Sequence, residues 1–238
     1  MSAKDKLFKL AGLARKPAFR TALARHRVAA AIEHLDAIAW CGARTLVDVG
    51  ANKGQFSLAW RGLTPAGRIH AFEPLPSAAA RFEAVFAGDD TVTLHRCAIG
   101  AERTQATFFV TDREDSSSLL EPGAGQKEAF AVSAKSRIEV PVRPLEDEVD
   151  LAALAHPVLL KIDVQGGELA VLGGIGALDA IDFIYVELSF VELYLGQPLF
   201  EDVRAFLAAR GFVLRGVFNQ AFTEAFGPTQ ADCLFVRA

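Results

Sequence analysis

The stretch TLVDVGANKG, residues 45–54, constrains the fold more than any other part of the sequence. Its apolar, β-branched run predicts a buried strand, and its two glycines predict a sharp turn into a helix that begins near residue 55. Gly50 lets the backbone leave the strand in a conformation that a Cβ would obstruct, and Gly54 lets a ligand or a strand approach the helix start. Such a unit opens an α/β sheet, whose ligands bind beyond the carboxyl ends of the strands.

The spacing of this turn argues against a phosphate-bearing ligand. The dinucleotide fingerprint G-x-G-x-x-G would need glycines where the chain has Asn52 and Gln55, and no G-x-x-x-x-G-K-[ST] loop occurs in the sequence. The pattern Asp-x-Gly-x-x-x-Gly therefore favours a nucleoside ligand without a pyrophosphate. A structural turn that binds no ligand is the alternative.

A second predicted strand, 68–73, ends in an acid about 20 residues after the glycine turn, where an acid in this fold class accepts hydrogen bonds from ribose hydroxyls. Pro74 follows Glu73 directly and stops the strand. The acid is thus held at the carboxyl end of the strand, on the ligand side. We expect Glu73 to bind ribose, against the alternative of a solvated carboxylate at a strand end.

Composition indicates an ordinary globular protein. With 238 residues, 51% of them hydrophobic and 23% charged, the chain can bury one sizeable core and is neither disordered nor fibrous. Cys41, Cys97 and Cys233 are far apart and lack C-x-x-C spacing, so neither a disulfide framework nor a zinc knuckle is indicated, and a reducing cytoplasm is expected. No signal peptide and no stretch of membrane-spanning length is predicted.

Charge is distributed unevenly. Residues 1–27 hold eight Lys or Arg and a single acid, which gives +7 and leaves −11 for the remainder of a chain whose net charge is −4. We therefore divide the chain into a basic helical arm, 1–40, and a domain, 41–238. Helices are predicted over 2–14 and 18–40; the arm is either a lid or membrane-surface contact, or it packs across the sheet edge with its charges in water. The acidic domain argues against nucleic-acid binding.

From residue 45 on, strand and helix patterns alternate, which predicts a mainly parallel sheet. The predicted strands are 45–49, 68–73, 91–95, 157–163 and 181–188, and the predicted helices are about 54–62, 76–86, 145–154, 168–172 and 199–210. Two further strands, 211–218 and 231–236, are expected to form an antiparallel hairpin at one edge. The segment 104–142 interrupts the alternation: strands at 106–110 and 138–142 flank the polar loop 112–126, which is either functional or mobile, or a plain serine-rich connector.

Four motifs, in this order and at these spacings, resemble those of the FkbM family of S-adenosylmethionine-dependent methyltransferases. They are DVGANKG at 48–54, FEP at 72–74, KIDVQG at 161–166 with Glu168, and YVEL at 185–188. The resemblance covers about residues 28–238, including 115–119 and 230–232. One departure is Gly167, where related sequences commonly carry a bulkier, often aromatic residue. The resemblance implies a Rossmann-like class I methyltransferase sheet, mainly parallel with an antiparallel C-terminal hairpin, behind an N-terminal helical arm.

The resemblance also implies S-adenosylmethionine as cofactor and assigns its contacts. The positions around its methionine portion are Asp48, Gly50, Asn52 and Gly54. Glu73 with Pro74 would hold the ribose, and Ala98 would lie near the adenine. A sulfonium with a free amine and carboxylate needs acids, carbonyls and N–H donors, which agrees with the absence of a phosphate loop. The positions expected to contact the acceptor are Ser117, Ser118 and Glu168.

Methyl transfer to a hydroxyl is an in-line displacement, and the hydroxyl must also lose its proton. Asp163 ends the fourth parallel strand and is the first candidate base; it is alternatively an anchor for the cofactor amine or a cap of the following helix. Glu187 is the second candidate, or else a buried partner of Lys161. Lys161 shares a strand face with Asp163 and pairs with a carboxylate or orients substrate. A metal site of Asp163, Glu168 and Glu187 is a further alternative, which no His pair at ligand spacing supports.

The sequence therefore predicts a cytoplasmic, S-adenosylmethionine-dependent O-methyltransferase. Members that resemble this chain often lie in glycan or secondary-metabolite pathways, so a sugar hydroxyl is the leading acceptor. The basic arm would suit a diphosphate-bearing or membrane-surface substrate. Two other functions stay open: methylation of nitrogen or carbon on a small molecule, and a non-catalytic nucleoside-binding protein. His34 and His95 receive no role, and the oligomeric state is not predicted.

Overall fold

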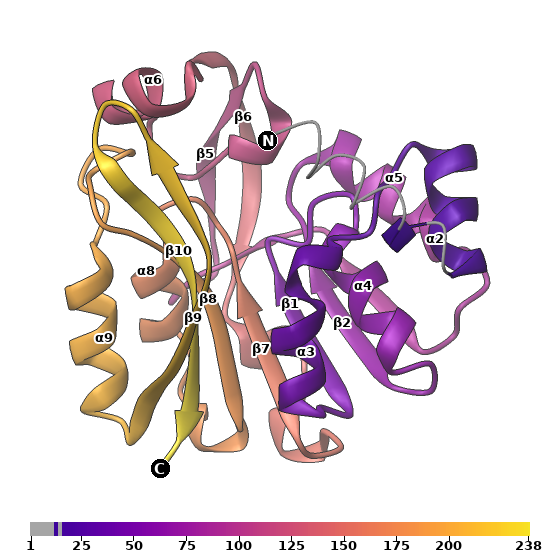
Figure 1. The fold of residues 1–238 in the computed structure, drawn as a ribbon. Coiled ribbons are helices and arrows are strands. Elements are labelled where there is room, and N and C mark those ends of the chain that lie inside the picture. Colours follow the sequence, from indigo (N-terminus) through magenta and orange to yellow (C-terminus); the bar gives the residue numbers. More distant parts are fainter. Residues whose placement is uncertain (1–11, 14–15) are drawn as a thin grey trace.

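Seven strands form the central sheet of the computed structural model, which describes residues 12–13 and 16–238 (Figure 1). In spatial order they are β3 (Val92–His95), β2 (Arg68–Phe72), β1 (Thr45–Val49), β7 (Val158–Ile162), β8 (Phe183–Ser189), β10 (Gly227–Arg237) and β9 (Phe212–Thr223). The first five are parallel, and β10 runs antiparallel to β8 and to β9. The predicted mainly parallel sheet with an antiparallel C-terminal hairpin is confirmed.

Helices cover both faces of this sheet (Figure 1). On one face lie α3 (Leu35–Cys41), α4 (Gln55–Leu63) and α5 (Pro76–Val85), and on the other lie α8 (Glu168–Gly173) and α9 (Phe200–Ala208). Successive side chains of a strand point to opposite faces, so Leu46 enters the core beneath α3 and α4 whereas Val47 enters the core beneath α8 and α9. Burial on both faces explains why the parallel strands read as continuous apolar runs.

The segment 104–142, predicted as two strands around a polar loop, belongs to a second sheet. Its strands are β4 (Ala98–Ile99), β6 (Ala134–Arg143) and β5 (Thr104–Thr111), in that spatial order, with β5 and β6 antiparallel. The loop between them folds into a 3-10 turn (Glu114–Ser116) and the helix α6 (Ala124–Phe130). Phe108 and Val140 pack against Leu75 and Ala78 at the start of α5. This sheet and α6 lie at the top of Figure 1, so the segment walls the end of the central sheet rather than looping freely.

The single helix predicted over 18–40 is wrong. The structure has α2 (Pro17–Thr21), a π-helical turn (Ala22–His26), an irregular stretch and a 3-10 turn (Ile32–His34) before α3. Arg27 ends the π-helical turn with a φ of 56°, in the left-handed region, so the helix cannot continue. Beyond it the Ala31 N–H donates to the Gln55 carbonyl at 3.0 Å. Tertiary contact with the start of α4 therefore overrides the helical pattern of the sequence.

The α2 part of the N-terminal segment packs on helices, whereas the 3-10 turn Ile32–His34 contacts the edge strand β9. The Phe19 ring of α2 lies against Gly62 of α4, where a Cβ would come within 2.5 Å of the ring. Phe19, Ala22 and Ile38 belong to the same core cluster as Leu46. The predicted helix over 2–14 lies almost entirely outside the described residues, whereas four of the eight basic residues counted over 1–27 are described: Lys16, Arg20, Arg25 and Arg27.

Smaller differences concern element ends. The helix predicted over 145–154 is only α7 (Leu145–Glu148), followed by a 3-10 turn (Leu151–Ala153).

No helix in the described part of the chain is both long and apolar enough to cross a membrane.

Candidate active site

The turn after β1 brings two strand ends into contact. Gly50 has a φ of 78°, and a Cβ there would lie 1.9 Å from the backbone oxygen of Asp163, just after β7. Only glycine fits both the conformation and the space. Gly54 has a φ of 84°, but the close neighbours of a Cβ there are the rings of Phe86 and Phe82, at 2.8 and 2.9 Å. Aromatic rings rather than a strand thus fill the space beside Gly54, and the approach of a ligand to this residue stays a prediction.

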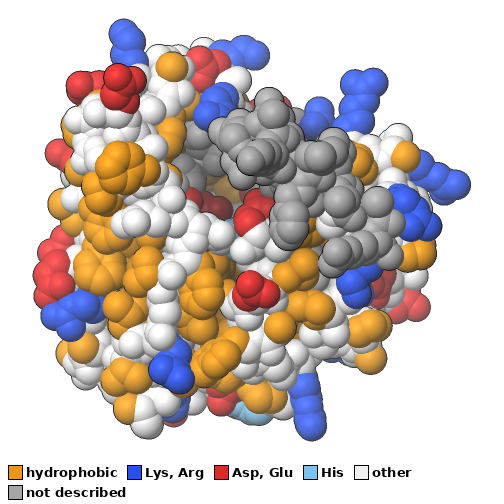
Figure 2. Space-filling model, viewed as in Figure 1, with side chains coloured by type: hydrophobic (Ala, Val, Ile, Leu, Met, Phe, Trp, Pro, Cys, Tyr) orange, Lys and Arg blue, Asp and Glu red, His pale blue; other side chains and the backbone are white. Residues whose placement is uncertain are grey.

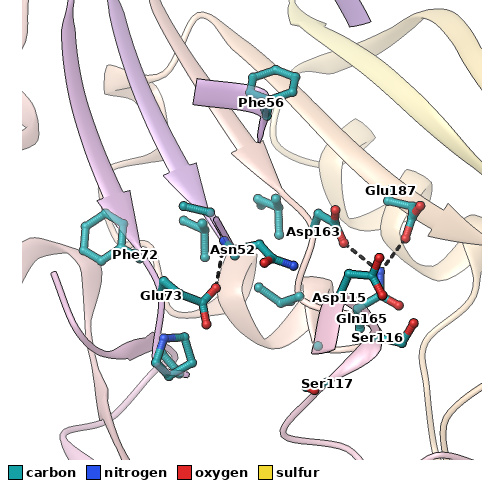
Figure 3. Close-up of a pocket in the computed structure, with 18 of the residues that line it drawn as sticks. Asn52, Phe56, Phe72, Glu73, Asp115, Ser116, Ser117, Asp163, Gln165 and Glu187 are labelled. Atoms are coloured by element: carbon teal, nitrogen blue, oxygen red, sulfur yellow. Dashed lines mark hydrogen bonds between the residues drawn. The ribbon is translucent and has the colours of Figure 1, made fainter. Parts of the chain in front are cut away.

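Glu73, just beyond β2, is fixed by two backbone N–H groups. Its Oε2 accepts from the Asn52 N–H at 2.8 Å (Figure 3), and its Oε1 accepts from the Leu75 N–H at 2.8 Å. Asn52 reaches this position with a φ of 49°, which Asn tolerates better than most residues. Glu73 is only 6% exposed, and burial raises the pKa of its carboxyl to about 7 against the effect of these two hydrogen bonds. The acid is thus rigidly held at the strand end, as predicted.

A cavity of about 830 Å³ opens at the carboxyl ends of the parallel strands. Its wall is built by the strand ends, the second sheet and residues of the N-terminal segment, and Figure 2 shows acidic side chains at the hollow. The predicted site residues in this wall are Gly50, Asn52, Glu73, Pro74, Ala98, Ser117, Lys161, Asp163 and Glu187. The structure therefore brings most of the predicted site together around one cavity of the size that small-molecule sites have, about 300–1,000 Å³.

Four predicted site residues do not line this cavity: Asp48, Gly54, Ser118 and Glu168. The Asp48 carboxylate is fully buried and accepts from the Ser57 hydroxyl at 2.6 Å. The Ser118 hydroxyl donates to the Gln165 carbonyl at 2.7 Å. These positions support the wall from behind, so their direct contact with cofactor or acceptor stays a prediction.

The Glu168 side chain accepts hydrogen bonds from the backbone of the loop that joins β7 to α8. Its Oε1 accepts from the backbone N–H groups of Gly166, at 2.9 Å, and Val164, at 3.3 Å. Burial raises the pKa of the Glu168 carboxyl to about 7. No side-chain hydrogen bond caps α8 at its N-cap residue Gly167, so the structure does not show the capping role that was an alternative for Asp163.

Lys161 holds the turn from beneath. Its Nζ donates to the Gly50 carbonyl at 2.9 Å, and lies 3.2 Å from Oδ1 of Asp48 and 3.7 Å from Oδ2 of Asp163. Burial lowers the pKa of this ammonium, but the carboxylates of Asp48 and Asp163 outweigh it and raise the pKa to about 12. Lys161 is therefore a fixed cation that pairs with Asp48 and Asp163, not with Glu187.

Gln165 bridges the two candidate bases (Figure 3). Its Nε2 donates to Oδ1 of Asp163 at 2.7 Å and to Oε2 of Glu187 at 2.8 Å. The Tyr194 hydroxyl lies 2.9 Å from the Gln165 Oε1, which orients the amide so that both of its N–H groups face the carboxylates. Sequence reasoning gave Gln165 no role, although it lies inside the KIDVQG motif.

Glu187 carries a strongly perturbed carboxyl. Burial, together with the negative charges of Asp163 and Asp232, holds the pKa of Glu187 well above its usual range. The amide of Gln230 donates to its Oε1 at 2.5 Å, and Asp232 is its register partner on β10. Among residues 12–13 and 16–238, no group of three or more His, Cys, Asp or Glu is placed to hold a metal ion. In particular, Glu168 faces backbone N–H groups rather than Asp163 and Glu187, the other two members of the metal site considered from the sequence.

A mainly parallel sheet of this strand order, with a glycine turn and an acid at adjacent strand ends, defines a class I methyltransferase. The chain belongs to the FkbM methyltransferase family: the family model described as "Methyltransferase FkbM domain" matches residues 48–214. The predicted family is thus confirmed, and the protein is a methyltransferase.

Two relatives share this part of the chain. The 2-O-methyltransferase NoeI of Sinorhizobium fredii (strain NBRC 101917 / NGR234) is 32% identical over 160 residues, covering 64% of this chain and 66% of NoeI. Methyltransferase 1 of Beauveria bassiana (strain ARSEF 2860) is 28% identical over 182 residues, covering 71% of this chain and 72% of that protein. The match thus spans about two thirds of NoeI.

Solved structures agree in fold. An O-methyltransferase candidate from Klebsiella pneumoniae is 15% identical, with a TM-score of 0.55 over 100% of this chain and 97% of that one. The cofactor-bound Rv0187 from MTB is 16% identical, with a TM-score of 0.51 over 98% of this chain and 94% of that one. At these identities the likeness concerns the fold alone.

Proposed function

We propose that the protein is an S-adenosylmethionine-dependent O-methyltransferase that acts on a hydroxyl of a sugar, or of a glycan or secondary-metabolite precursor. The observation that carries the proposal is that two backbone N–H groups fix the Glu73 carboxylate at a strand end, beside a glycine turn whose sequence is not that of a phosphate-binding loop. A relative named as a 2-O-methyltransferase supports transfer to oxygen. We place the activity in the cytoplasm, because Cys41, Cys97 and Cys233 are buried and unpaired.

The cavity residues fit such a cofactor. Near the glycine turn, the carboxylate of Glu73 would accept hydrogen bonds from the ribose hydroxyls. The apolar side chains of Phe72 and Ile99, beside Ala98, would suit the purine ring. Asp163, which is in the wall and already faces a lysine and an amide, would receive the cofactor amine. When bound, the cofactor supplies a methyl group on a cationic sulfur, and the protein's own part is to orient the acceptor and to exclude water.

Glu187 lies beyond Asp163 at the adjacent strand end, on the acceptor side of this arrangement. As a carboxyl with a raised pKa it would hydrogen-bond the acceptor hydroxyl and so orient it. Lys161 would keep Asp163 and the glycine turn in place. Ser117, whose hydroxyl accepts from the Thr111 N–H at 3.1 Å, would face the acceptor from the second sheet.

Transfer of a labelled methyl group tests this function. The full chain is incubated with S-adenosylmethionine labelled with ¹³C in its methyl group and a panel of methyl glycosides, phenols and amines, and products are followed by NMR. A ¹³C signal in the methoxy region is expected. A signal in the N-methyl or C-methyl region would overturn O-methylation. Cofactor binding without turnover would favour the non-catalytic alternative.

We further propose that the basic N-terminal segment meets an anionic partner, either a diphosphate-bearing acceptor or a membrane surface. The proposal rests on charge alone: residues 1–27 carry +7 in a chain whose net charge is −4. Deleting residues 2–16 should raise KM for a phosphate-bearing acceptor while kcat changes little. An unchanged KM would contradict it.

A further inference from the structure

A histidine from the N-terminal segment stands over the acceptor side of the cavity. His34 is the last residue of the 3-10 turn Ile32–His34 and contacts three strands of the central sheet through its Nδ1. This atom lies 3.0 Å from the Tyr185 hydroxyl on β8, 3.1 Å from Nδ2 of Asn219 on β9 and 3.3 Å from Oδ2 of Asp232 on β10. The ring also packs against Phe56 of α4, with ring centroids 5.3 Å apart. Four elements thus fix one imidazole.

The same cluster adjoins the candidate catalytic carboxylates. Asp232 is the register partner of Glu187, and Tyr185 is the register partner of Lys161. His34, Tyr185 and Asp232 all belong to the wall of the 830 Å³ cavity. The imidazole therefore lies in the same cavity as the proposed methyl transfer, beside Glu187 rather than beside Glu73.

The contacts at Nδ1 favour a proton on that nitrogen. Of the three groups at Nδ1, the Asn219 amide only donates and the Tyr185 hydroxyl can donate or accept, but the Asp232 carboxylate only accepts and is the charged group. A proton on Nδ1 gives this carboxylate a donor, and Asn219 donates to the same oxygen at 2.8 Å. In the described part of the chain, Nε2 has no hydrogen-bond partner. Burial raises the pKa of Tyr185, so its hydroxyl keeps its proton, and Asp232 is the one charged group among the ring's contacts from α4, β8, β9 and β10. An imidazole in this tautomer presents a bare Nε2 on its opposite side.

We propose that His34 is the general base of the methyl transfer and that Asp232 is a positioning residue that sets its tautomer. This inference rests on the proposed O-methyltransferase function and deepens it. The acceptor O–H proton passes to Nε2 of His34 as the oxygen lone pair forms a bond to the methyl carbon. The bond from that carbon to sulfur breaks, and its electron pair stays on sulfur. A neutral ring and a sulfonium thus become an imidazolium and a neutral thioether, so the charge balances.

The tautomer of His34 is the first test, and it needs no acceptor. Full-length protein with ¹⁵N-labelled histidine is saturated with S-adenosylhomocysteine, and long-range ¹H–¹⁵N spectra are recorded at about pH 7.5. His34 is assigned from the spectrum of His34→Gln or, if that variant does not fold, from cross-peaks to the rings of Tyr185 and Phe56. We expect a protonated Nδ1 and a bare Nε2, and a shift toward the other tautomer in Asp232→Asn. A proton on Nε2, alone or with one on Nδ1, would overturn the proposal, because such a ring cannot accept the acceptor's proton.

Turnover is the second test, and the chain offers a matched control. Nδ1 of His156 lies 2.7 Å from Oδ2 of Asp182, so this residue is also a histidine paired with an aspartate, but it lies outside the cavity. His34→Gln should lower kcat by about 100-fold or more, leave the Kd for S-adenosylhomocysteine within about twofold, and show a kcat that rises with pH as hydroxide replaces the base. His156→Gln should match the parent. A His34→Gln enzyme with a kcat close to that of the parent would overturn the proposal. If the parent methylates none of the panel, the acceptor class is wrong, and the tautomer alone decides the role of His34.

Discussion

Glu73 illustrates, at the scale of single residues, how burial and hydrogen bonding oppose each other in this site. Two backbone N–H groups stabilise its charged form, yet burial raises the pKa of the carboxyl to about 7. The ionised carboxylate is the stronger acceptor for ribose hydroxyls, so below about pH 7 ligand binding is coupled to release of a proton. Affinity for S-adenosylhomocysteine should therefore fall about tenfold between about pH 8 and pH 6, as measured by calorimetry.

Glu73→Gln serves as the control for this prediction, because it keeps the shape of the side chain and removes its titration. The variant should bind more weakly at about pH 8 and show little change down to about pH 6. Equal affinity of the parent at both pH values would mean that Glu73 does not change its ionisation when the ligand binds.

Single residues were predictable where their position at a strand end determined their role. Glu73 and Asp163 belong to this group, because a strand and its terminating residue can be recognised locally. Gln165, Tyr194 and His34 were not, because their partners come from distant parts of the chain: Tyr194 reaches back to Gln165, and His34 meets Tyr185 and Asp232. No periodicity in the sequence reports such contacts.

At the scale of elements, the crossing of two strand ends at Gly50 is the most demanding local feature. A Cβ at Gly50 would meet the Asp163 backbone oxygen at 1.9 Å, whereas at Gly88, with a similar φ of 83°, no atom lies within 4 Å. Gly88→Ala should therefore cost only the left-handed strain, about 1 kcal/mol of unfolding free energy. Gly50→Ala should cost about 3 kcal/mol or more. Urea unfolding of both variants measures the difference, and equal losses would refute the steric argument.

The loop after β7 gives a second prediction at this scale. The folded-state pKa of Glu168, about 7, is raised above its usual value, so its contribution to stability is present at low pH and is lost as pH rises through about 7. Glu168→Gln keeps an oxygen for the N–H groups of Gly166 and Val164 but cannot ionise. Relative to this variant, the parent should lose on the order of 2 kcal/mol of unfolding free energy between about pH 5 and pH 8. The exposed Glu201→Gln is the control, and parallel pH profiles for the parent and Glu168→Gln would contradict the prediction.

Elements were predictable wherever the alternation of strand and helix was regular. The parallel strands fall within one or two residues of their predicted ends, because the central ones, β1, β7 and β8, are buried on both faces and all five are bounded by turn residues. The helix over 18–40 was not predictable, since Arg27 adopts a left-handed φ and Ala31 bonds to Gln55 of α4. The second sheet was missed for a related reason: β5 and β6 pair across the intervening loop and α6.

At the scale of the whole molecule, three parts of the chain meet around one cavity. The central sheet supplies Glu73, Asp163 and Glu187 at or near its strand ends, the loop between β5 and α6 supplies Ser117, and the N-terminal segment supplies His34. Figure 3 shows Glu73 and Glu187 on opposite sides of Asp163. We infer that the cofactor lies toward Glu73 and the acceptor toward Glu187, so that the methyl group passes between them.

Calorimetric titration of the full-length protein with S-adenosylhomocysteine tests this account most directly, with Glu73→Ala as the test variant and Glu201→Ala on α9 as the control. The account predicts micromolar binding to the parent and to Glu201→Ala, and a Kd at least tenfold higher for Glu73→Ala, a loss of about 1.4 kcal/mol. No binding to the parent, or equal binding to Glu73→Ala, would contradict the claim that the cavity at the strand ends is the cofactor site.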